Sequence, residues 1–347
     1  MKKIQTLNDP ISEKVRKYSV ELSEFYPLLL TKYPLNLYDK EIHSYKEYFN
    51  LVFFSSALVG IFDRIKKEYD AHAVALYHKI ALSTFLLDTL NKFDSQNFPE
   101  RIRALYCRWF ERVYKDLSVQ PDSYYHYEKE SFCKDLAVCC LKALPVGGAW
   151  VVEPSRVSTK FLLKKVWPYL EERAHVNFTK NKQKGKKRIR ERVVTLLIRL
   201  RLNKTIIPIL TLFLETLKVY RLHYVIHTVG RYLPRFTKEQ MNQAYMNIAD
   251  LMKIHPSICG IYRESWFLDP NLKCISPELS YLWEVPQQNG ATLFCVGNYH
   301  KAVKKATFMS PFRKRLYEEG KYRPMNYAYV WPREELLRWA NMVSWKI

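Results

Sequence analysis

The sequence predicts an α+β protein, in which a helical N-terminal region is followed by a C-terminal α/β domain with a mixed sheet of about four strands. Apolar residues spaced three and four apart dominate the first 145 residues, and this is the spacing of one helix face. From residue 221 onward, short apolar runs alternate with helical patterns, as in helices packed on a parallel or mixed sheet. Glycine supports the same division, because Gly60 is the only one of the 9 glycines that precedes residue 147.

The N-terminal region is predicted to be all-helical. Residues 71–90 have the clearest helical periodicity, and residues 47–65 are apolar enough to form a buried helix. Pro99 opens a further helix, and residues 128–144 form another that Pro145 ends. A helical bundle with most of the aromatic side chains in its core is the simplest arrangement of these segments.

We expect three segments along the chain: a helical domain over residues 1–145, a basic helical connector over 146–220 and the α/β domain over 221–347. The connector carries most of the charge. From Lys160 to Lys204 the sequence has 15 Lys and Arg against 3 Glu. Within this tract, residues 187–202 have the pattern of a basic helix.

The C-terminal segment has the element order β-α-β-α-β-α-β-α. Thr237 and Gln240 form a capping box, which predicts a helix start. Ser310 and Pro311 predict a second helix start, and Gly320 follows the end of that helix. The predicted strands cover residues 221–229, 257–267, 291–296 and 325–331.

Composition restricts the partner and the compartment. The 56 Lys and Arg exceed the 34 Asp and Glu by 22, which favours a polyanionic or phosphate-bearing partner. The 7 cysteines contain no CxxC pair and are read as reduced thiols. The longest uncharged apolar run in the middle of the chain, residues 205–214, is too short to cross a bilayer. We therefore expect a cytoplasmic protein without a transmembrane segment, either free or peripheral to a membrane.

Several nucleotide-binding and catalytic signatures are absent from the sequence. It has no GxxxxGK[ST], GxGxxG, HExxH or GxSxG motif and no EF-hand loop, which disfavours P-loop, dinucleotide-binding and thermolysin-like chemistry. His223 and His227 lie four apart on one face of a predicted strand, but no third ligand is identifiable. We predict no metal site, and we keep His227 as a candidate catalytic residue because it lies near the strand end.

A second candidate site follows the predicted strand 257–267. Arg263 and Glu264 are charged residues inside an apolar strand, and Asp269 lies in the Asp-Pro turn after it. In open α/β sheets, ligands bind beyond the carboxyl ends of strands. Glu264 is therefore a candidate catalytic residue, and Arg263 and Asp269 are candidate ligand-binding residues. The alternative is an internal Arg–Glu ion pair, or an edge strand in solvent.

Two further segments could bind an anion. Gly230, Arg231 and Arg235 precede the helix at Thr237, where backbone N–H groups and arginines could hold a phosphate. Arg313 lies in the first turn of the helix after Ser310, where a positive charge opposes the helix dipole and a bound anion would explain it. The alternatives are an ordinary strand–helix loop and a solvated helix face.

The basic tract offers a different function, the binding of a polyanion without catalysis. The partner would be nucleic acid or an anionic membrane surface. Residues 180–204 contain no aromatic side chain, and the apolar stretch that follows shifts the expectation toward a membrane or a partner protein. The predicted polyanion-binding residues are Lys182, Lys184, Lys186, Lys187, Arg188, Arg190 and Arg192.

The β-α-β-α-β order of residues 221–347 resembles the core of acyl-CoA-dependent N-acyltransferases. The resemblance implies acyl transfer, with acyl-CoA as the candidate cofactor. For an enzyme of this kind, we expect Glu264 or His227 to be the general base and Arg231 and Arg263 to hold the anion. It rests on element order, because the glycine-rich Q/RxxGxG/A loop of that family is absent and residues 227–237 stand in its place. A third possibility is a protein-interaction factor.

Overall fold

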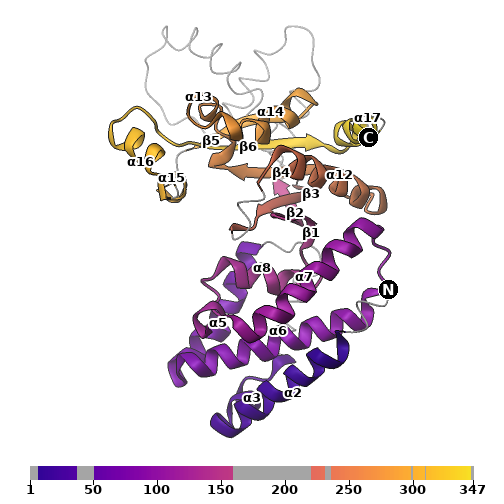
Figure 1. Ribbon diagram of the computed structural model, residues 1–347, viewed down its shortest axis with the longest axis vertical. Helices are drawn as coiled ribbons and strands as arrows, with labels where there is room; N and C mark the ends of the chain where they lie inside the picture. Colours follow the sequence, from indigo (N-terminus) through magenta and orange to yellow (C-terminus); the bar gives the residue numbers. More distant parts are fainter. Residues whose placement is uncertain are drawn as a thin grey trace, which may run out of the picture.

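A computed structural model describes residues 7–36, 51–158, 220–230, 236–297, 300–308 and 310–344 (Figure 1). The predicted α+β class is confirmed, with a helical N-terminal region and a mixed sheet toward the C-terminus. The sheet has six strands where the sequence predicted about four. The two additional strands come from residues 144–158, most of which were expected to begin the helical connector. The rest of that connector, residues 159–219, lies outside the described residues, and the division into domains stays a prediction.

The N-terminal helices pack around α6 (Figure 1). Its position follows from composition, since residues on all sides of this helix are apolar and most are buried. Within the described residues, α6 is the one helix with the length and hydropathy of a membrane span, and 78% of that apolar window is buried inside the protein. It is therefore read as the core helix of the bundle. The elements of this region are α2 (Asn8–Phe25), α3 (Leu29–Lys32), α5 (Leu51–Glu68), α6 (Ala71–Phe93), α7 (Glu100–Val119), η1 (Asp122–Tyr124) and α8 (Glu130–Cys139).

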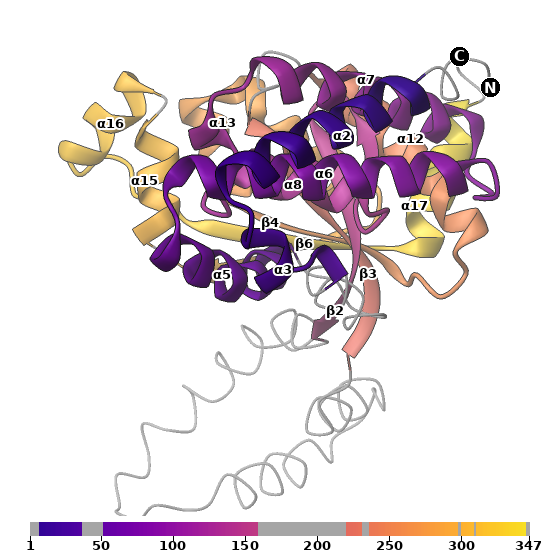
Figure 2. The ribbon, with the colours of Figure 1, turned by 90° about the horizontal axis from the view of Figure 1, so that it is seen from below.

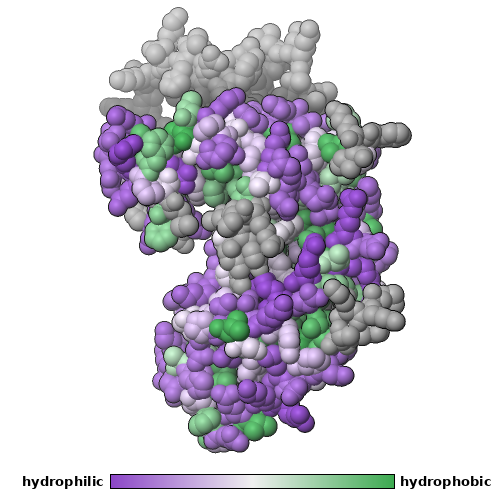
Figure 3. Space-filling model, viewed as in Figure 1, coloured by the Kyte–Doolittle hydropathy of each residue, from purple (hydrophilic) through white to green (hydrophobic). Residues whose placement is uncertain are grey.

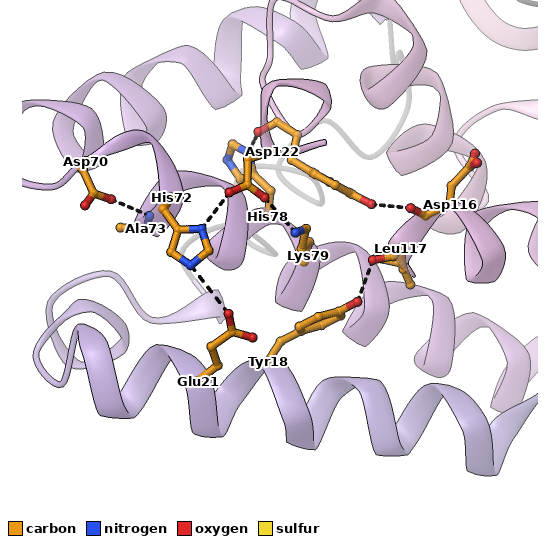
Figure 4. Close-up of polar contacts among 11 residues, drawn as sticks. Tyr18, Glu21, Asp70, His72, Ala73, His78, Lys79, Asp116, Leu117 and Asp122 are labelled. Carbon is orange, nitrogen blue, oxygen red and sulfur yellow. Dashed lines mark hydrogen bonds and ion pairs between the residues drawn. The ribbon is translucent and has the colours of Figure 1, made fainter. Parts of the chain in front are cut away.

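Polar contacts tie these helices to one another (Figure 4). His72 of α6 lies between two carboxylates, with Nδ1 2.6 Å from Asp122 Oδ2 and Nε2 3.5 Å from Glu21 Oε1. The ammonium of Lys79, about two turns after His72 on α6, is 2.8 Å from Asp122 Oδ1. The hydroxyl of Tyr18 donates to the carbonyl oxygen of residue 117 at 2.7 Å. Together these contacts connect α2, α6, α7 and η1.

The sheet has the strand order β1-β2-β3-β4-β6-β5. Neighbouring strands are antiparallel except for β3 and β4, which are parallel. All four strands predicted in the C-terminal segment are present, the second of them shorter than expected. The strands are β1 (Leu144–Gly147), β2 (Trp150–Ser158), β3 (Tyr220–Thr228), β4 (Gly260–Ser265), β5 (Thr292–Gly297) and β6 (Asn326–Pro332).

Helix α12 (Lys238–Ile254) packs on one face of the sheet beside α17 (Arg333–Ser344). The predicted cap is present, because the Thr237 hydroxyl accepts a hydrogen bond from the backbone N–H of Gln240 at 3.3 Å. Tyr245 of α12 packs edge-on against Trp331 of β6, with 5.2 Å between the ring centres. Buried apolar residues of the helical region and of the sheet form one continuous cluster, so the two regions share a core.

The remaining elements lie at the carboxyl end of β4 and along β6. They are η3 (Trp266–Leu268), α13 (Leu272–Ile275), η4 (Pro277–Leu279), α14 (Tyr281–Gln288), α15 (His300–Phe308) and α16 (Pro311–Glu318). Helices α15 and α16, which we call the α15–α16 projection, stand out from the end of the sheet in both ribbon views (Figures 1 and 2). As predicted, α16 begins at a cap, where Ser310 Oγ accepts from the N–H of Arg313 at 3.2 Å.

Candidate functional site

A cavity of about 990 Å³ opens at the carboxyl ends of β3 and β4. Because these two strands are parallel, both end at the same edge of the sheet, and the chain leaves them in different directions. The cavity is bounded by Glu130 of α8, by the strand ends at Thr228 and Ser265, and by the α15–α16 projection. Figure 3 shows the surface hollowed between that projection and the N-terminal helices. Of the residues predicted from the sequence, His227, Arg263, Glu264 and Arg313 line this cavity.

Arg263 and Glu264 do not form the internal ion pair that the sequence left open. Neighbouring residues of a strand project to opposite faces, so the two side chains diverge. Arg263 is buried against α12, with Nη1 3.5 Å from Met241 Sδ. Glu264 is exposed on the other face, where Oε2 accepts from the Tyr262 hydroxyl at 2.8 Å. The strand register places Glu264 on the same face as His227.

The Arg263 guanidinium lies at the floor of the cavity, and the residue is only 1% exposed. Nη2 donates to Thr228 Oγ1 at 3.3 Å, and the guanidinium carbon is 5.9 Å from the ring centre of Phe236. Both partners line the cavity. The hydroxyls of Tyr245 and Tyr329 also interact with the guanidinium. Among the residues that the structure describes, no carboxylate lies within ion-pair distance of Arg263, and the groups that contact its guanidinium are a thioether, hydroxyls and an aromatic ring.

His227 is held by a buried carboxylate from the next strand. Its Nε2 is 3.0 Å from Glu153 Oε1, and 1% of the Glu153 side chain is exposed. The contact is diagonal across the antiparallel β2–β3 pair, since His227 is directly opposite Val151. Glu153 was not among the residues predicted from the sequence. A single acidic residue inside the apolar run 150–154 was the available signal, because an acid is rarely buried without a partner.

His223 shares the face of His227 but not its surroundings. The side chain is buried, Nδ1 contacts the backbone oxygen of Arg221 at 3.0 Å, and burial lowers the pKa of His223. In the described part of the chain, no group of three His, Cys, Asp or Glu side chains is arranged to hold a metal ion. All seven cysteines are described, and none of them is paired in a disulfide.

A buried lysine lies behind the strand end at the cavity rim. Lys134 of α8 donates to the carbonyl oxygen of Thr228, and its ammonium is 2.5 Å from Glu130 Oε1. Burial lowers the pKa of Lys134, although the Glu130 carboxylate partly opposes the effect. Glu130 also lies 3.9 Å from the Lys305 ammonium across the cavity. The Glu130–Lys134 pair has i, i+4 spacing, but the sequence offered no signal for the contacts with Thr228 and Lys305, which lie 94 or more positions away.

Arg313 and Asp269 have different surroundings from those expected. Arg313 Nε donates to the backbone oxygen of Ala306 at 2.9 Å, and the guanidinium lies 5.0 Å from the ring centre of Trp266. Burial lowers the pKa of Arg313. Asp269 is not part of the cavity lining. Its oxygens accept from the backbone N–H groups of Asn271 at 3.0 Å and Met325 at 3.2 Å, so this carboxylate holds the turn. Burial raises the pKa of Asp269.

The remaining predicted residues lie outside the described ranges. These include Arg231 and Arg235, which follow the cavity-lining Gly230, and the seven polyanion-binding residues between positions 182 and 192. Polyanion binding by the tract 160–204 therefore stays a prediction.

Comparison of the chain with family models, with curated proteins and with solved structures found no match. The resemblance of the element order to acyl-CoA-dependent N-acyltransferases therefore gains no support from related chains. The geometry of the cavity and the charges around it are the evidence that bears on function.

Proposed function

We propose that the cavity at the β3 and β4 ends binds a phosphate-bearing ligand with an apolar portion, and that the protein transfers an acyl group within it. The observation that carries the proposal is the buried Arg263 guanidinium at the cavity floor, which has no carboxylate partner among the described residues. An ion removed from water costs several kcal/mol unless an opposite charge compensates it. An anionic group in the cavity would supply that charge at short range and in a low-dielectric setting.

Further cations support anion binding on the opposite wall. Lys304 and Lys305 of α15 and Arg313 of α16 line the cavity. Within the described residues, Lys304 and Arg313 have no carboxylate within 4.0 Å. Three carboxylates, those of Glu130, Glu264 and Glu278, also line the cavity, so its charge is mixed. A mixed lining suits a ligand that is anionic at one end and undergoes proton transfer at the other.

The apolar part of the lining fits the second half of the proposed ligand. Aromatic and aliphatic side chains form much of the wall between the two charged regions. Cavities of several hundred Å³ with mainly apolar walls and a few polar groups are typical ligand sites. An acyl chain or another apolar group could pack against these side chains, which are Ile226, Phe236, Trp266, Phe267, Leu279 and Phe308.

The His227–Glu153 contact supplies the chemistry of the proposal. When Nε2–H donates to the buried Glu153 carboxylate, Nδ1 keeps its lone pair and can act as general base. The amine or hydroxyl of an acceptor would attack the thioester carbonyl carbon of the substrate. The C–S bond would break, and the acceptor proton would pass through Nδ1 to the leaving thiolate. Glu264, exposed on the same face, is the alternative base.

The first test is ligand binding measured by calorimetry and thermal shift with an acyl-CoA, free CoA and ATP. We expect saturable binding that Arg263→Gln weakens and Arg263→Lys partly restores. Should the buried substitution unfold the protein, Lys304→Gln and Arg313→Gln on the cavity wall replace it. The control is Arg338→Gln, because Arg338 is exposed on α17 and ion-paired with Glu335. Equal binding by the cavity variants and the control would refute anion binding here.

The second test is thiol release from an acyl-CoA in the presence of amine acceptors. His227→Asn is expected to lower the rate about 100-fold or more while ligand binding persists, since a general base contributes about 10²–10⁴ in rate. His223→Asn is the matched control, because His223 is on the same strand and face and does not line the cavity. Binding without any thiol release would leave a ligand-binding protein and overturn the acyl-transfer part.

A further inference from the structure

The α15–α16 projection carries a concentration of exposed apolar side chains. Phe308 is 78% exposed, Phe312 47% and Tyr317 42%. They are three of the eight large hydrophobic side chains that are exposed in the described part of the chain, although the two helices are only 9 and 8 residues long. Figure 3 shows green areas among purple on the part of the surface over these helices. Several exposed apolar side chains close together indicate a contact surface.

The base of the projection is anchored, so the exposed side chains are held in place. A small apolar cluster fixes it to the sheet end through Trp266, Leu272, Ala302, Ala306 and Tyr322. Arg313 adds hydrogen bonds to the backbone of Ala306 and to Ser276 Oγ at 3.1 Å. The outer face of the projection has no comparable packing in the described structure.

The same segment of the sequence is strongly basic. Residues 301–323 contain 8 Lys and Arg against 2 Glu, a net charge of +6. The carboxylates of Glu318 and Glu319 lie 3.8 Å from Lys314 and 3.9 Å from Arg315. These four side chains are exposed, and such pairs are weak in water, so the cations remain able to bind a partner. The partner that complements this surface is therefore negatively charged and accepts apolar side chains.

We infer that the α15–α16 projection docks the protein on an anionic membrane surface, with Phe308 and Phe312 inserted among the headgroups and the surrounding Lys and Arg bound to lipid phosphates. Lysines and arginines beside inserted phenylalanines are the composition of interfacial membrane-binding helices. Single-stranded nucleic acid fits less well, because it stacks bases on open aromatic faces. The Phe312 ring already has the Arg315 guanidinium 5.6 Å from its centre.

The exposed surface of the projection adjoins the cavity, which is a further argument for a lipid bilayer as the partner. Phe308 both protrudes from the projection and lines the cavity mouth. A docked protein would thus have the cavity next to the lipid, and an amphiphile could pass between them. This last step depends on the proposed function, whereas docking itself does not.

The test is flotation of the full-length protein with vesicles, in the absence of any cavity ligand. Vesicles of phosphatidylcholine alone are compared with vesicles containing 25% phosphatidylglycerol, at low and high salt. We expect binding to the anionic vesicles that weakens as salt rises. The double variant Phe308→Ser/Phe312→Ser should lower partitioning about tenfold or more. Lys314→Gln/Arg315→Gln should lower it by a similar factor, at about fivefold per charge.

Two matched controls use exposed residues of the N-terminal helical region. Phe25→Ser/Leu28→Ser removes apolar side chains that are 66% and 68% exposed, and Lys66→Gln/Lys67→Gln removes two exposed positive charges. Both should float as the unaltered protein does, and circular dichroism verifies folding of every variant.

Three results would overturn the inference: equal flotation of projection and control variants, equal binding to neutral vesicles, or capture by single-stranded RNA without vesicle binding. Because the assay contains no cavity ligand, its failure is distinct from failure of the proposed function. If acyl-CoA binding is absent but flotation is intact, the proposed function fails and membrane docking stands.

Discussion

The buried imidazole of His78 predicts that the helical region loses stability in mild acid. His78 lies in α6 and is completely buried, stacked on Phe132 with 5.1 Å between ring centres. Nδ1 contacts the backbone oxygen of Tyr125 (Figure 4), while Nε2 has no hydrogen-bond partner among the described residues. Burial lowers the pKa of His78 to about 3, because the charged form cannot be solvated there.

The sign and the size of the effect follow from proton linkage. The folded protein resists protonation of His78 below the ordinary histidine pKa of about 6.5, whereas the unfolded chain does not. The folded state is therefore fully stable above that value and loses stability as the pH falls toward the folded pKa. At pH 5 almost every unfolded imidazole is protonated, and the loss from this single group is about 2 kcal/mol.

The assay is urea unfolding at pH 7 and pH 5, followed by circular dichroism. His78→Asn removes the titrating group and keeps an N–H that can donate toward Tyr125. The variant should be less stable at pH 7, because ring volume is lost. Between pH 7 and pH 5, its free energy of unfolding should fall by about 2 kcal/mol less than that of the unaltered protein. Phe93→Leu is the control, since it truncates another buried ring of α6 and leaves His78 in place. Its free energy of unfolding should fall between pH 7 and pH 5 by as much as that of the unaltered protein. If His78→Asn loses as much stability between pH 7 and pH 5 as the unaltered protein, His78 is not the group responsible.

Three further predictions concern stability and are measured by thermal and urea denaturation. Gly260→Ala should destabilise by about 3 kcal/mol or more, because the added Cβ would lie 2.4 Å from the backbone oxygen of Trp331 in the paired strand; an unchanged melting temperature would contradict this packing. Gly60→Ala should stabilise by about 0.5–1 kcal/mol, since Gly60 is inside helix α5 with open space around it; a destabilised variant would argue against that helix. Asp70→Ala should cost about 1 kcal/mol and Asp70→Asn less, because Asp70 caps α6 by accepting from the N–H of Ala73 at 2.9 Å; equal losses in both variants would indicate that the cap is not what matters.

Helix starts and strand positions of the C-terminal segment could be predicted because their signals are local. The hydroxyls of Thr237 and Ser310 accept hydrogen bonds from backbone N–H groups three residues further along the chain. Each capping pattern is therefore complete within one turn of sequence. The strand at 220–228 and the helix at 71–93 follow from hydrophobic periodicity over a similar span. The edge of the sheet at which a ligand would bind was also expected, from the rule that ligands lie beyond strand ends.

Which strands and side chains are neighbours in the sheet depends on contacts between residues far apart in the sequence. Strands β1 and β2 precede the predicted α/β segment, and they join the sheet only through the antiparallel pairing of β1 with β2 and of β2 with β3. That pairing places Glu153 beside His227, across 74 positions of sequence. Adjacency of Arg263 and Glu264 in the sequence suggested an ion pair, which strand alternation prevents.

The sequence by itself therefore determined the α+β class, the order of the C-terminal elements and the location of the charge at two basic tracts. Tertiary structure alone decided which charged groups share an environment. It buried Arg263 without a carboxylate partner among the described residues, gave His227 its carboxylate and brought Lys134 behind the strand end. The physical reason is that periodicity and capping act over a few residues, whereas burial and electrostatic partners depend on how the sheet and the helices pack across the whole chain.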